Sequence, residues 1–268
     1  MMPGELPELT DPNQAPVKVA GGFGSVEGLV YSRLNYLLFC DTTASRIMKW
    51  EDGKISVFRE ESPATGLTFD HQGRLLACER GRVTRTEKDG KISVLADHLH
   101  APYDLVYAID GSIYFSDAAR APGVPAIYQI TRHGEVRVVS RDCKLPSGVA
   151  LAANQQKLYA ADTSGGKIWV YGIASDGALR GGRVFASAPA RGLKTDEAGN
   201  VWAAEGHAIA VYDPAGQRRG TIPLPEDPSN CAWGDRSGEH GYNFPHLFVT
   251  AQTSIYKIET KMNGTHTY

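Results

Sequence analysis

The sequence predicts an all-β fold, a six-bladed β-propeller with four antiparallel strands in each blade. Three observations predict it: a strand pattern that repeats about every 40 residues, six short turn-like openings, and glycine-containing turns between strands. The openings begin 38, 38, 44, 44 and 39 residues apart. They are Glu27-Gly28-Leu29, Thr65-Gly66-Leu67, Tyr103-Asp104-Leu105, Ser147-Gly148-Val149, Arg191-Gly192-Leu193 and Asn230-Cys231-Ala232.

Each opening begins the first strand of a repeat, and the later strands follow in a fixed order. Residues 37–41 are typical of the second strand, and 46–50 of the third. Apolar residues alternate there with polar ones, and β-branched and aromatic residues are frequent, which favours strands over helices. Asp-Gly turns such as 52–53 separate them, because glycine accepts the positive φ of a tight hairpin. Fourth, outer strands are expected in five repeats, at 54–58, 91–95, 135–139, 182–185 and 220–224.

The sixth repeat lacks a fourth strand of its own, because the chain ends soon after its third strand. A strand-like segment at 16–20 has no repeat to belong to. We expect it to complete the last blade and close the ring, since closure removes an exposed sheet edge. No blade can bury its faces alone, so we predict a single propeller domain over 1–268.

Composition and charge limit the partners. The formal net charge of −2 leaves no basic surface for nucleic acid, and no apolar run is long enough to span a membrane. Residues 1–14 carry three acidic groups and no apolar core of a signal peptide, so we expect a cytoplasmic protein. The four cysteines form no CxxC pair and are expected to be reduced. Cys40 and Cys78, at equivalent strand positions, are expected to be buried. Oligomeric state is not encoded in these features.

In a four-stranded blade, the loops that enter the first strands lie at one end of the channel, which we call the mouth. Glu27 is the first candidate there, as a metal ligand, a general base or a structural hydrogen-bond acceptor. Arg191 needs a carboxylate partner or an anionic ligand, and Glu27 is the obvious partner if both point inward. We therefore expect a small-molecule substrate, for which an anionic group would suit Arg191.

The other openings offer further polar groups. Asp104 could be catalytic or could cap its own turn, and Tyr103 could transfer a proton, stack on a ligand or simply form the wall. Candidate substrate-binding groups are Thr65, Ser147, Asn230 and His207. The acids that recur at the end of the second strands are expected to cap turns or to pair with nearby cations. They are Asp41, Glu79, Asp117, Asp162 and Glu205.

These motifs together resemble those of the senescence marker protein / gluconolactonase / luciferin-regenerating enzyme family, from about residue 22 to residue 258. The resemblance implies a six-bladed propeller that hydrolyses lactones, with one divalent cation such as calcium or zinc in the channel. The matching segments are EGL at 27–29, GLTFD at 66–70, GRLLACE at 73–79, DGSIYFSD at 110–117, LYAAD at 158–162, GNVW at 199–202 and NCAWG at 230–234.

Family members are similar in holding the cation with a Glu, an Asn and an Asp. Here Glu27 matches the Glu, but Ser147 stands in place of the Asn and Arg191 in place of the Asp. A second Asn-Asp pair on the substrate side corresponds to Tyr103-Asp104. A cation beside Arg191 would be repelled by it. We therefore predict that Arg191 takes the place of the metal and neutralises Glu27, so that no cofactor is needed.

Three functions follow from these residues. The first is a lactonase or esterase-like hydrolase acting on a small cyclic ester in the central channel. The second is a metal-independent acid/base enzyme, such as a cyclase, isomerase or lyase on a natural-product-like substrate. It would use Glu27 or Asp104 as base, Tyr103 as acid and Arg191 to stabilise an oxyanion. The third is a non-catalytic protein that binds a small anion. Resemblance to the family favours the hydrolase.

Overall fold

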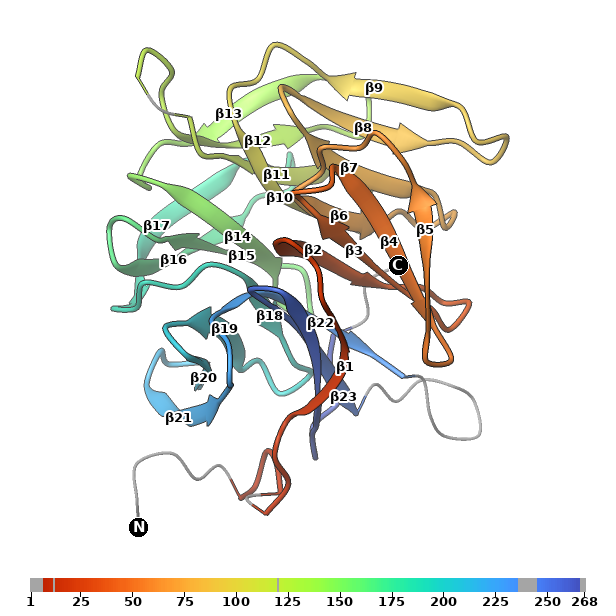
Figure 1. Cartoon of the computed structure of the whole chain (residues 1–268). Helices are drawn as coiled ribbons and strands as arrows, with labels where there is room; N and C mark the ends of the chain where they lie inside the picture. Colours follow the sequence, from red (N-terminus) through yellow and green to blue (C-terminus); the bar gives the residue numbers. More distant parts are fainter. Residues whose placement is uncertain (1–6, 12, 120, 236–244, 266–268) are drawn as a thin grey trace.

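The computed structural model describes residues 7–11, 13–119, 121–235 and 245–265, which form six four-stranded antiparallel sheets (Figure 1). The first strand of each sheet contacts the first strands of the sheets on both sides, so the six inner strands form a closed ring around a channel. The predicted six-bladed β-propeller is confirmed. We number the blades 1 to 6 in chain order.

Blades 1 to 3 follow one another along the chain, each running from the inner to the outer strand. Their strands are β2 (Val26–Tyr31), β3 (Leu37–Asp41), β4 (Arg46–Glu51), β5 (Lys54–Arg59), β6 (Gly66–Phe69), β7 (Leu75–Glu79), β8 (Arg82–Thr86), β9 (Ile92–Ala96), β10 (Pro102–Tyr107), β11 (Ile113–Asp117), β12 (Ala126–Ile130) and β13 (Val136–Ser140). The expected outer strands are present, with ends moved by about one residue.

Blades 4 to 6 repeat the arrangement, and only the last takes a strand from elsewhere in the chain. Their strands are β14 (Pro146–Leu151), β15 (Lys157–Asp162), β16 (Lys167–Ile173), β17 (Leu179–Ala186), β18 (Leu193–Thr195), β19 (Val201–Glu205), β20 (Ala208–Tyr212), β21 (Arg218–Pro223), β22 (Pro228–Gly234), β23 (His246–Ala251) and β24 (Ser254–Glu259). Strand β17 is longer than the predicted 182–185.

The ring closes through the N-terminal strand, as predicted. Strand β1 (Val17–Gly21) pairs antiparallel with β24 and becomes the outer strand of blade 6, with Val17 opposite Lys257. The strand begins one residue later than the predicted 16–20. Figure 1 shows β1, from the beginning of the chain, in the same blade as the late strands β22 and β23, and β24 lies between β1 and β23. The two ends of the described chain are thereby joined in one sheet.

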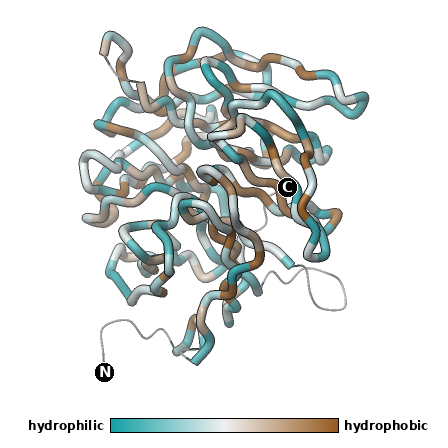
Figure 2. The backbone as a smooth tube through the Cα atoms, viewed as in Figure 1, coloured by the Kyte–Doolittle hydropathy of each residue, from teal (hydrophilic) through white to brown (hydrophobic). Residues whose placement is uncertain are grey.

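The hydrophobic core lies between the blades. Six clusters of buried side chains each join two neighbouring blades, so every blade buries both faces against its neighbours. Between blades 5 and 6, the rings of Trp202 and Trp233 pack edge to face at a centroid distance of 5.1 Å. Figure 2 shows hydrophobic residues concentrated along the strands and hydrophilic ones at the turns. The four cysteines are buried and free, as expected.

No helix of membrane-spanning length and hydropathy occurs in the described ranges.

One position in the predicted repeat was wrong. In four blades, the residue that pairs with the last residue of the second strand lies immediately before the opening. These residues are Val26, Pro102, Pro146 and Pro228. The sixth opening therefore begins at 229, one residue earlier than predicted, and Asn230 occupies the position of the glycine. No glycine is present there to fix the register, which is why the sequence alone placed it incorrectly.

A carboxylate holds the closing strand in place. Glu226 accepts hydrogen bonds from the hydroxyls of Ser254 (2.6 Å) and Tyr256 (2.9 Å), from the Thr253 amide (2.9 Å) and from the Lys18 ammonium (3.2 Å). Partial burial acts to raise the pKa of Glu226, but these hydrogen bonds outweigh burial and lower the pKa to about 2. The ionised form is therefore the one that the folded ring prefers.

We expect Glu226→Gln to lower the free energy of unfolding at pH 7 by roughly 1–2 kcal/mol, because charge-assisted hydrogen bonds are replaced by neutral ones. A lowered carboxylate pKa stabilises the fold above its ordinary value of 4.5, and this contribution is lost as the pH falls toward about 2. The difference between variant and wild type should therefore shrink from pH 5 to pH 2 in urea titrations. Glu135→Gln, at an exposed site, is the control; a constant deficit at all pH values would contradict the assignment.

Candidate functional site

Six chain segments meet at the mouth because the blades approach closely there. A Cβ on Gly28 would lie 2.4 Å from the carbonyl oxygen of Thr65, and one on Gly148 would lie 2.3 Å from that of Arg191. Glycine at this position thus lets the start of one inner strand pack on the next. Asp104 and Asn230 occupy the same position in blades 3 and 6, where a side chain is accommodated.

The first residues of the openings alternate in role around the ring. In blades 2, 4 and 6 they carry hydroxyls that donate to the backbone of the next blade. Thr65 donates to the carbonyl of Tyr103 at 3.0 Å, Ser147 to that of Arg191 at 3.1 Å, and Ser229 to that of Val26 at 2.8 Å. These hydroxyls hold neighbouring blades together. The structure shows no such role for the first residues of the other three blades.

In blades 1, 3 and 5 the first residues are Glu27, Tyr103 and Arg191, and their side chains meet. The Tyr103 hydroxyl donates to Glu27 Oε2 at 2.9 Å. Arg191 Nη2 donates to Tyr103 Oη at 3.0 Å and forms an ion pair with Glu27 Oε1. The predicted Glu27–Arg191 pair is therefore present, with Tyr103 as a third member. We call this group the triad.

Burial gives the triad unusual electrostatics. The Glu27 side chain is only 11% exposed, and burial raises the pKa of its carboxyl, although Arg191 and the Tyr103 hydroxyl act to lower it. Burial also raises the pKa of Tyr103, and the charge of Glu27 adds to the effect. The phenol therefore stays protonated at neutral pH. The Arg191 side chain is 42% exposed, so the positively charged member of the triad is the one in contact with solvent.

Arg191 keeps hydrogen-bonding capacity for a ligand. Both of its side-chain hydrogen bonds within the described residues use Nη2. A guanidinium has five N–H donors, so the donors on Nη1 and Nε remain available. An oxygen atom that enters the mouth can therefore accept a hydrogen bond from a fixed cation.

Asp104 and Asn230 lie one position deeper in the channel. Asp104 is buried, and its Oδ2 accepts a hydrogen bond from the Val149 amide at 3.1 Å. Burial raises the pKa of Asp104, while the charge of Lys194 and hydrogen bonds from backbone amides and Asn230 act to lower it. Asn230 Oδ1 also accepts from the Cys231 amide at 2.8 Å. Both side chains are thus held mainly by the backbone, below the triad.

His207 lies apart from the triad. Its imidazole is 81% exposed and pairs with Asp227 on the surface. The acids at the ends of the second strands have structural partners, in line with expectation. Asp117 accepts hydrogen bonds from the His100 and Ala101 amides, and Glu79 pairs with Arg59 and Arg82; the remaining three accept hydrogen bonds from the residues Ala44, Leu145, Gly165 and Tyr212.

The residues at the mouth do not fit a divalent cation. A hard cation needs several oxygen ligands, and in the described residues no three His, Cys, Asp or Glu side chains are grouped to supply them. The Glu27 carboxylate already accepts hydrogen bonds from both other members of the triad, and the Ser147 hydroxyl is engaged with backbone carbonyls. The positive charge that faces Glu27 is supplied by the Arg191 guanidinium.

The chain is thus a six-bladed β-propeller with polar and charged side chains gathered at one end of its channel. A family model described as "SMP-30/Gluconolactonase/LRE-like region" matches residues 25–253. The chain belongs to this family. At the level of the family, membership supports an enzyme, a hydrolase of the lactonase type.

Individual relatives agree with the family assignment. The chain is 25% identical to the gluconolactonase of Zymomonas mobilis, over 86% of this chain and 76% of the relative. It is 25% identical to a solved gluconolactonase of Xanthomonas campestris, with a TM-score of 0.82 and 96% of both chains covered. A luciferin-regenerating enzyme, 16% identical, shares the fold with a TM-score of 0.81, over 94% of this chain and 98% of the other.

Proposed function

We propose that this protein hydrolyses a small cyclic ester at the mouth of its channel and that the triad performs the chemistry. The observation that carries the proposal is the contact of a buried carboxylate, a protonated phenol and a guanidinium with unused donors in one place. The gluconolactonase relatives support an ester as the substrate class. The proposal assigns to Arg191 the electrophilic role that a bound cation has in other members of the family.

Arg191 would act on the carbonyl of the ester. When water attacks a lactone, the carbonyl oxygen becomes an oxyanion in the tetrahedral intermediate. A guanidinium fixed by Glu27 and Tyr103 needs no reorganisation to stabilise that charge, because its orientation is set before the substrate binds. Nη1 or Nε would donate the hydrogen bond, since Nη2 is engaged in the triad.

Glu27 would act as the general base. Burial raises the pKa of Glu27 toward neutral pH. A general base accepts a proton from water most efficiently when its pKa lies near the working pH. The carboxylate takes a proton from the attacking water, and the C–O bond of the ring then breaks. The proton passes from Glu27 to the departing alkoxide, and the products are a hydroxyl and a carboxylic acid on one open chain; the acid then ionises and releases its proton to the solvent. Tyr103 positions Glu27 through its hydrogen bond.

The acid/base alternative uses the same residues. Its specific support is that the candidate base Glu27 contacts a phenol, which can donate a proton, and a guanidinium, which can stabilise an oxyanion. The two functions differ in their products. Hydrolysis adds the mass of one water to the substrate, whereas a cyclisation or isomerisation conserves mass and an elimination divides it.

The test is turnover of a panel of four-, five- and six-membered lactones in the presence of a chelator, followed by mass spectrometry in ¹⁸O-water. The proposal predicts ring opening with one ¹⁸O atom incorporated, at a rate that the chelator does not change. Glu27→Gln should be slower by about 10²- to 10⁴-fold under the same conditions. Conversion of a substrate without gain of water would favour the acid/base enzyme, and binding without conversion would favour an anion-binding protein.

A further inference from the structure

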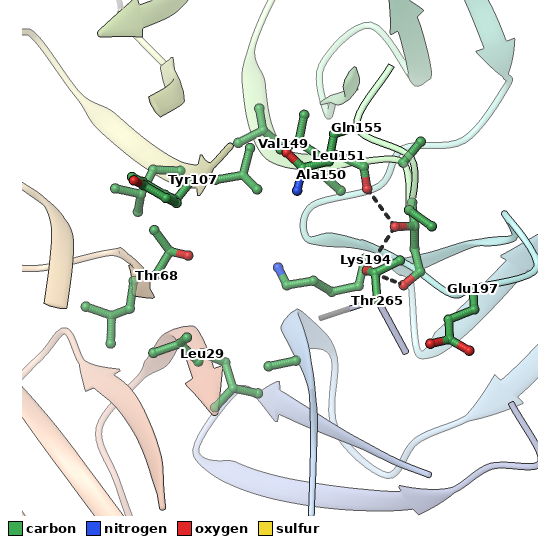
Figure 3. Close-up of a pocket in the computed structure, with 18 residues that line it drawn as sticks. Leu29, Thr68, Tyr107, Val149, Ala150, Leu151, Gln155, Lys194, Glu197 and Thr265 are labelled. Atoms are coloured by element: carbon green, nitrogen blue, oxygen red, sulfur yellow. Dashed lines mark hydrogen bonds between the residues drawn. The ribbon is translucent and has the colours of Figure 1, made fainter. Parts of the chain in front are cut away.

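The channel contains a cavity at the end away from the triad. The inner strands run from the mouth inward, and the cavity is lined by residues from their middle and later parts, including Leu29, Thr68 and Tyr107. Its volume is about 220 Å³, and its lining reaches the exposed residue Glu197 at the surface (Figure 3). None of the three members of the triad lines it.

Two charged residues line this cavity, the exposed Glu197 at its surface end and Lys194 on an inner strand. The third residue after the start of each opening lines it in all six blades, and five of these six residues are uncharged. The exception is Lys194 on β18, which extends into the cavity in Figure 3. The six are Val30, Thr68, Val106, Ala150, Lys194 and Ala232.

The Lys194 ammonium has capacity for a ligand. It donates one hydrogen bond, to the Leu193 carbonyl at 3.1 Å, and it forms no ion pair with a carboxylate of the described residues. An ammonium has three donors, so two remain. Asp104 acts on Lys194 through its charge, but its Oδ2 is bound to the Val149 amide.

A second polar group faces the same space. Thr68 is only 3% exposed, and its hydroxyl makes no hydrogen bond with any residue that the structure describes. Thr68 lines the cavity, and its hydroxyl can donate or accept a hydrogen bond there. In Figure 3 the Thr68 side chain and the Lys194 amine face one another across the cavity. One acceptor group between them could bond to both.

The chemistry of the lining selects the ligand class. Aliphatic residues such as Leu29, Leu105 and Val149 form one part of the wall, and polar residues form the rest. Lys194 is the one cation of this lining, and the Glu197 carboxylate lies at its surface end. A phosphate dianion would need more donors than one ammonium and one hydroxyl, whereas a carboxylate is matched by them. A cavity of about 150 Å³ accommodates benzene, so the space here suits a body of that size with a carboxylate attached.

We propose that this cavity is a second ligand site, separate from the triad, that binds a small apolar monocarboxylate through Lys194 and Thr68. The carboxylate lies between the ammonium and the hydroxyl, and the apolar body lies against the aliphatic walls. The proposal does not rest on the hydrolase function, because no residue of the triad takes part in it.

Calorimetric titration with benzoate tests the proposal. Wild-type protein should bind one benzoate per chain, and Lys194→Met should weaken binding by about tenfold or more through loss of a charge-assisted hydrogen bond. Thr68→Val, which keeps the side-chain shape, should weaken it by a smaller factor. Lys91→Met removes an exposed lysine on the outside and should bind benzoate as the wild type does. The neutral analogue benzamide should bind equally to wild type and Lys194→Met.

Glu27→Gln and Arg191→Met separate this site from the triad, and both should retain the wild-type affinity for benzoate. Thermal unfolding of Lys194→Met should match that of wild type, which shows that a loss of binding is not a loss of fold. The proposal is overturned if wild type shows no saturable benzoate binding or if folded Lys194→Met binds benzoate as tightly as wild type. It is equally overturned if Arg191→Met is the variant that loses binding.

Discussion

Replacing Arg191 by methionine should lower kcat/KM for lactone hydrolysis by about 100-fold or more, the usual cost of losing a preorganised donor to an oxyanion. Methionine keeps the length and much of the volume of the side chain but has neither charge nor N–H groups. The loss should fall mainly on kcat, because the developing oxyanion, unlike the neutral ester carbonyl, depends on the cation. Steady-state kinetics on the best lactone of the panel measures both constants.

Arg141→Met serves as the matched control, because Arg141 is exposed and lies outside the channel openings. Arg191→Lys should recover only part of the activity, since an ammonium supplies a point charge without the planar set of donors that contacts Glu27 and Tyr103. Undiminished turnover in folded Arg191→Met would remove Arg191 from the mechanism.

Replacing Glu27 by glutamine should lower kcat/KM by about 10²- to 10⁴-fold, the range expected for loss of a general base. In wild type, activity should rise with pH as Glu27 ionises, with a midpoint above its ordinary value of 4.5, because burial raises its pKa. The residual activity of Glu27→Gln should lack this acidic limb. Tyr103→Phe should move the limb to higher pH, since the Tyr103 hydroxyl stabilises the ionised carboxylate.

The pH profile separates a base from a merely structural carboxylate. If Glu27 only held Arg191 in place, Glu27→Gln would lose activity but the acidic limb would persist, because another group would be responsible for it. A retained limb with an unchanged midpoint would contradict the role assigned to Glu27. Glu135→Gln, at an exposed outer position, should keep the wild-type profile.

The fold could be predicted from the sequence because each blade repeats the same strands and turns, and the errors mark places where the repeat loses a signal. The sixth opening was misplaced by one residue because Asn230 replaces the glycine that marks the position in blades 1, 2, 4 and 5. The closing strand β1 was predictable, since blade 6 lacked a fourth strand and one segment was left over.

The site was predictable only in part. The opposite charges of Glu27 and Arg191 at equivalent positions predicted their ion pair. The sequence did not show that Tyr103 would be the third partner, or that Thr65 and Ser147 would bond to the backbone. Both depend on which way each side chain points in the folded ring. Lys194 was missed because it lies inside a strand, and only the cavity beside it distinguishes it from a surface lysine.

The central claim is that the Arg191 guanidinium replaces the divalent cation that the family resemblance implies beside Glu27. Replacing Arg191 by an acid should therefore restore cation binding. In Arg191→Asp a second carboxylate would face Glu27 in place of the guanidinium, and the repulsion between them would favour a cation between the two. This variant should gain affinity for calcium or zinc that wild type lacks.

Calorimetric titration of the wild type and of Glu27→Gln, each with calcium and with zinc, tests the claim most directly. We expect the same heats from wild type and Glu27→Gln, with no saturable site that depends on Glu27, because the Arg191 guanidinium already pairs with that carboxylate. Binding of one divalent cation per wild-type chain, lost in Glu27→Gln, would contradict the claim.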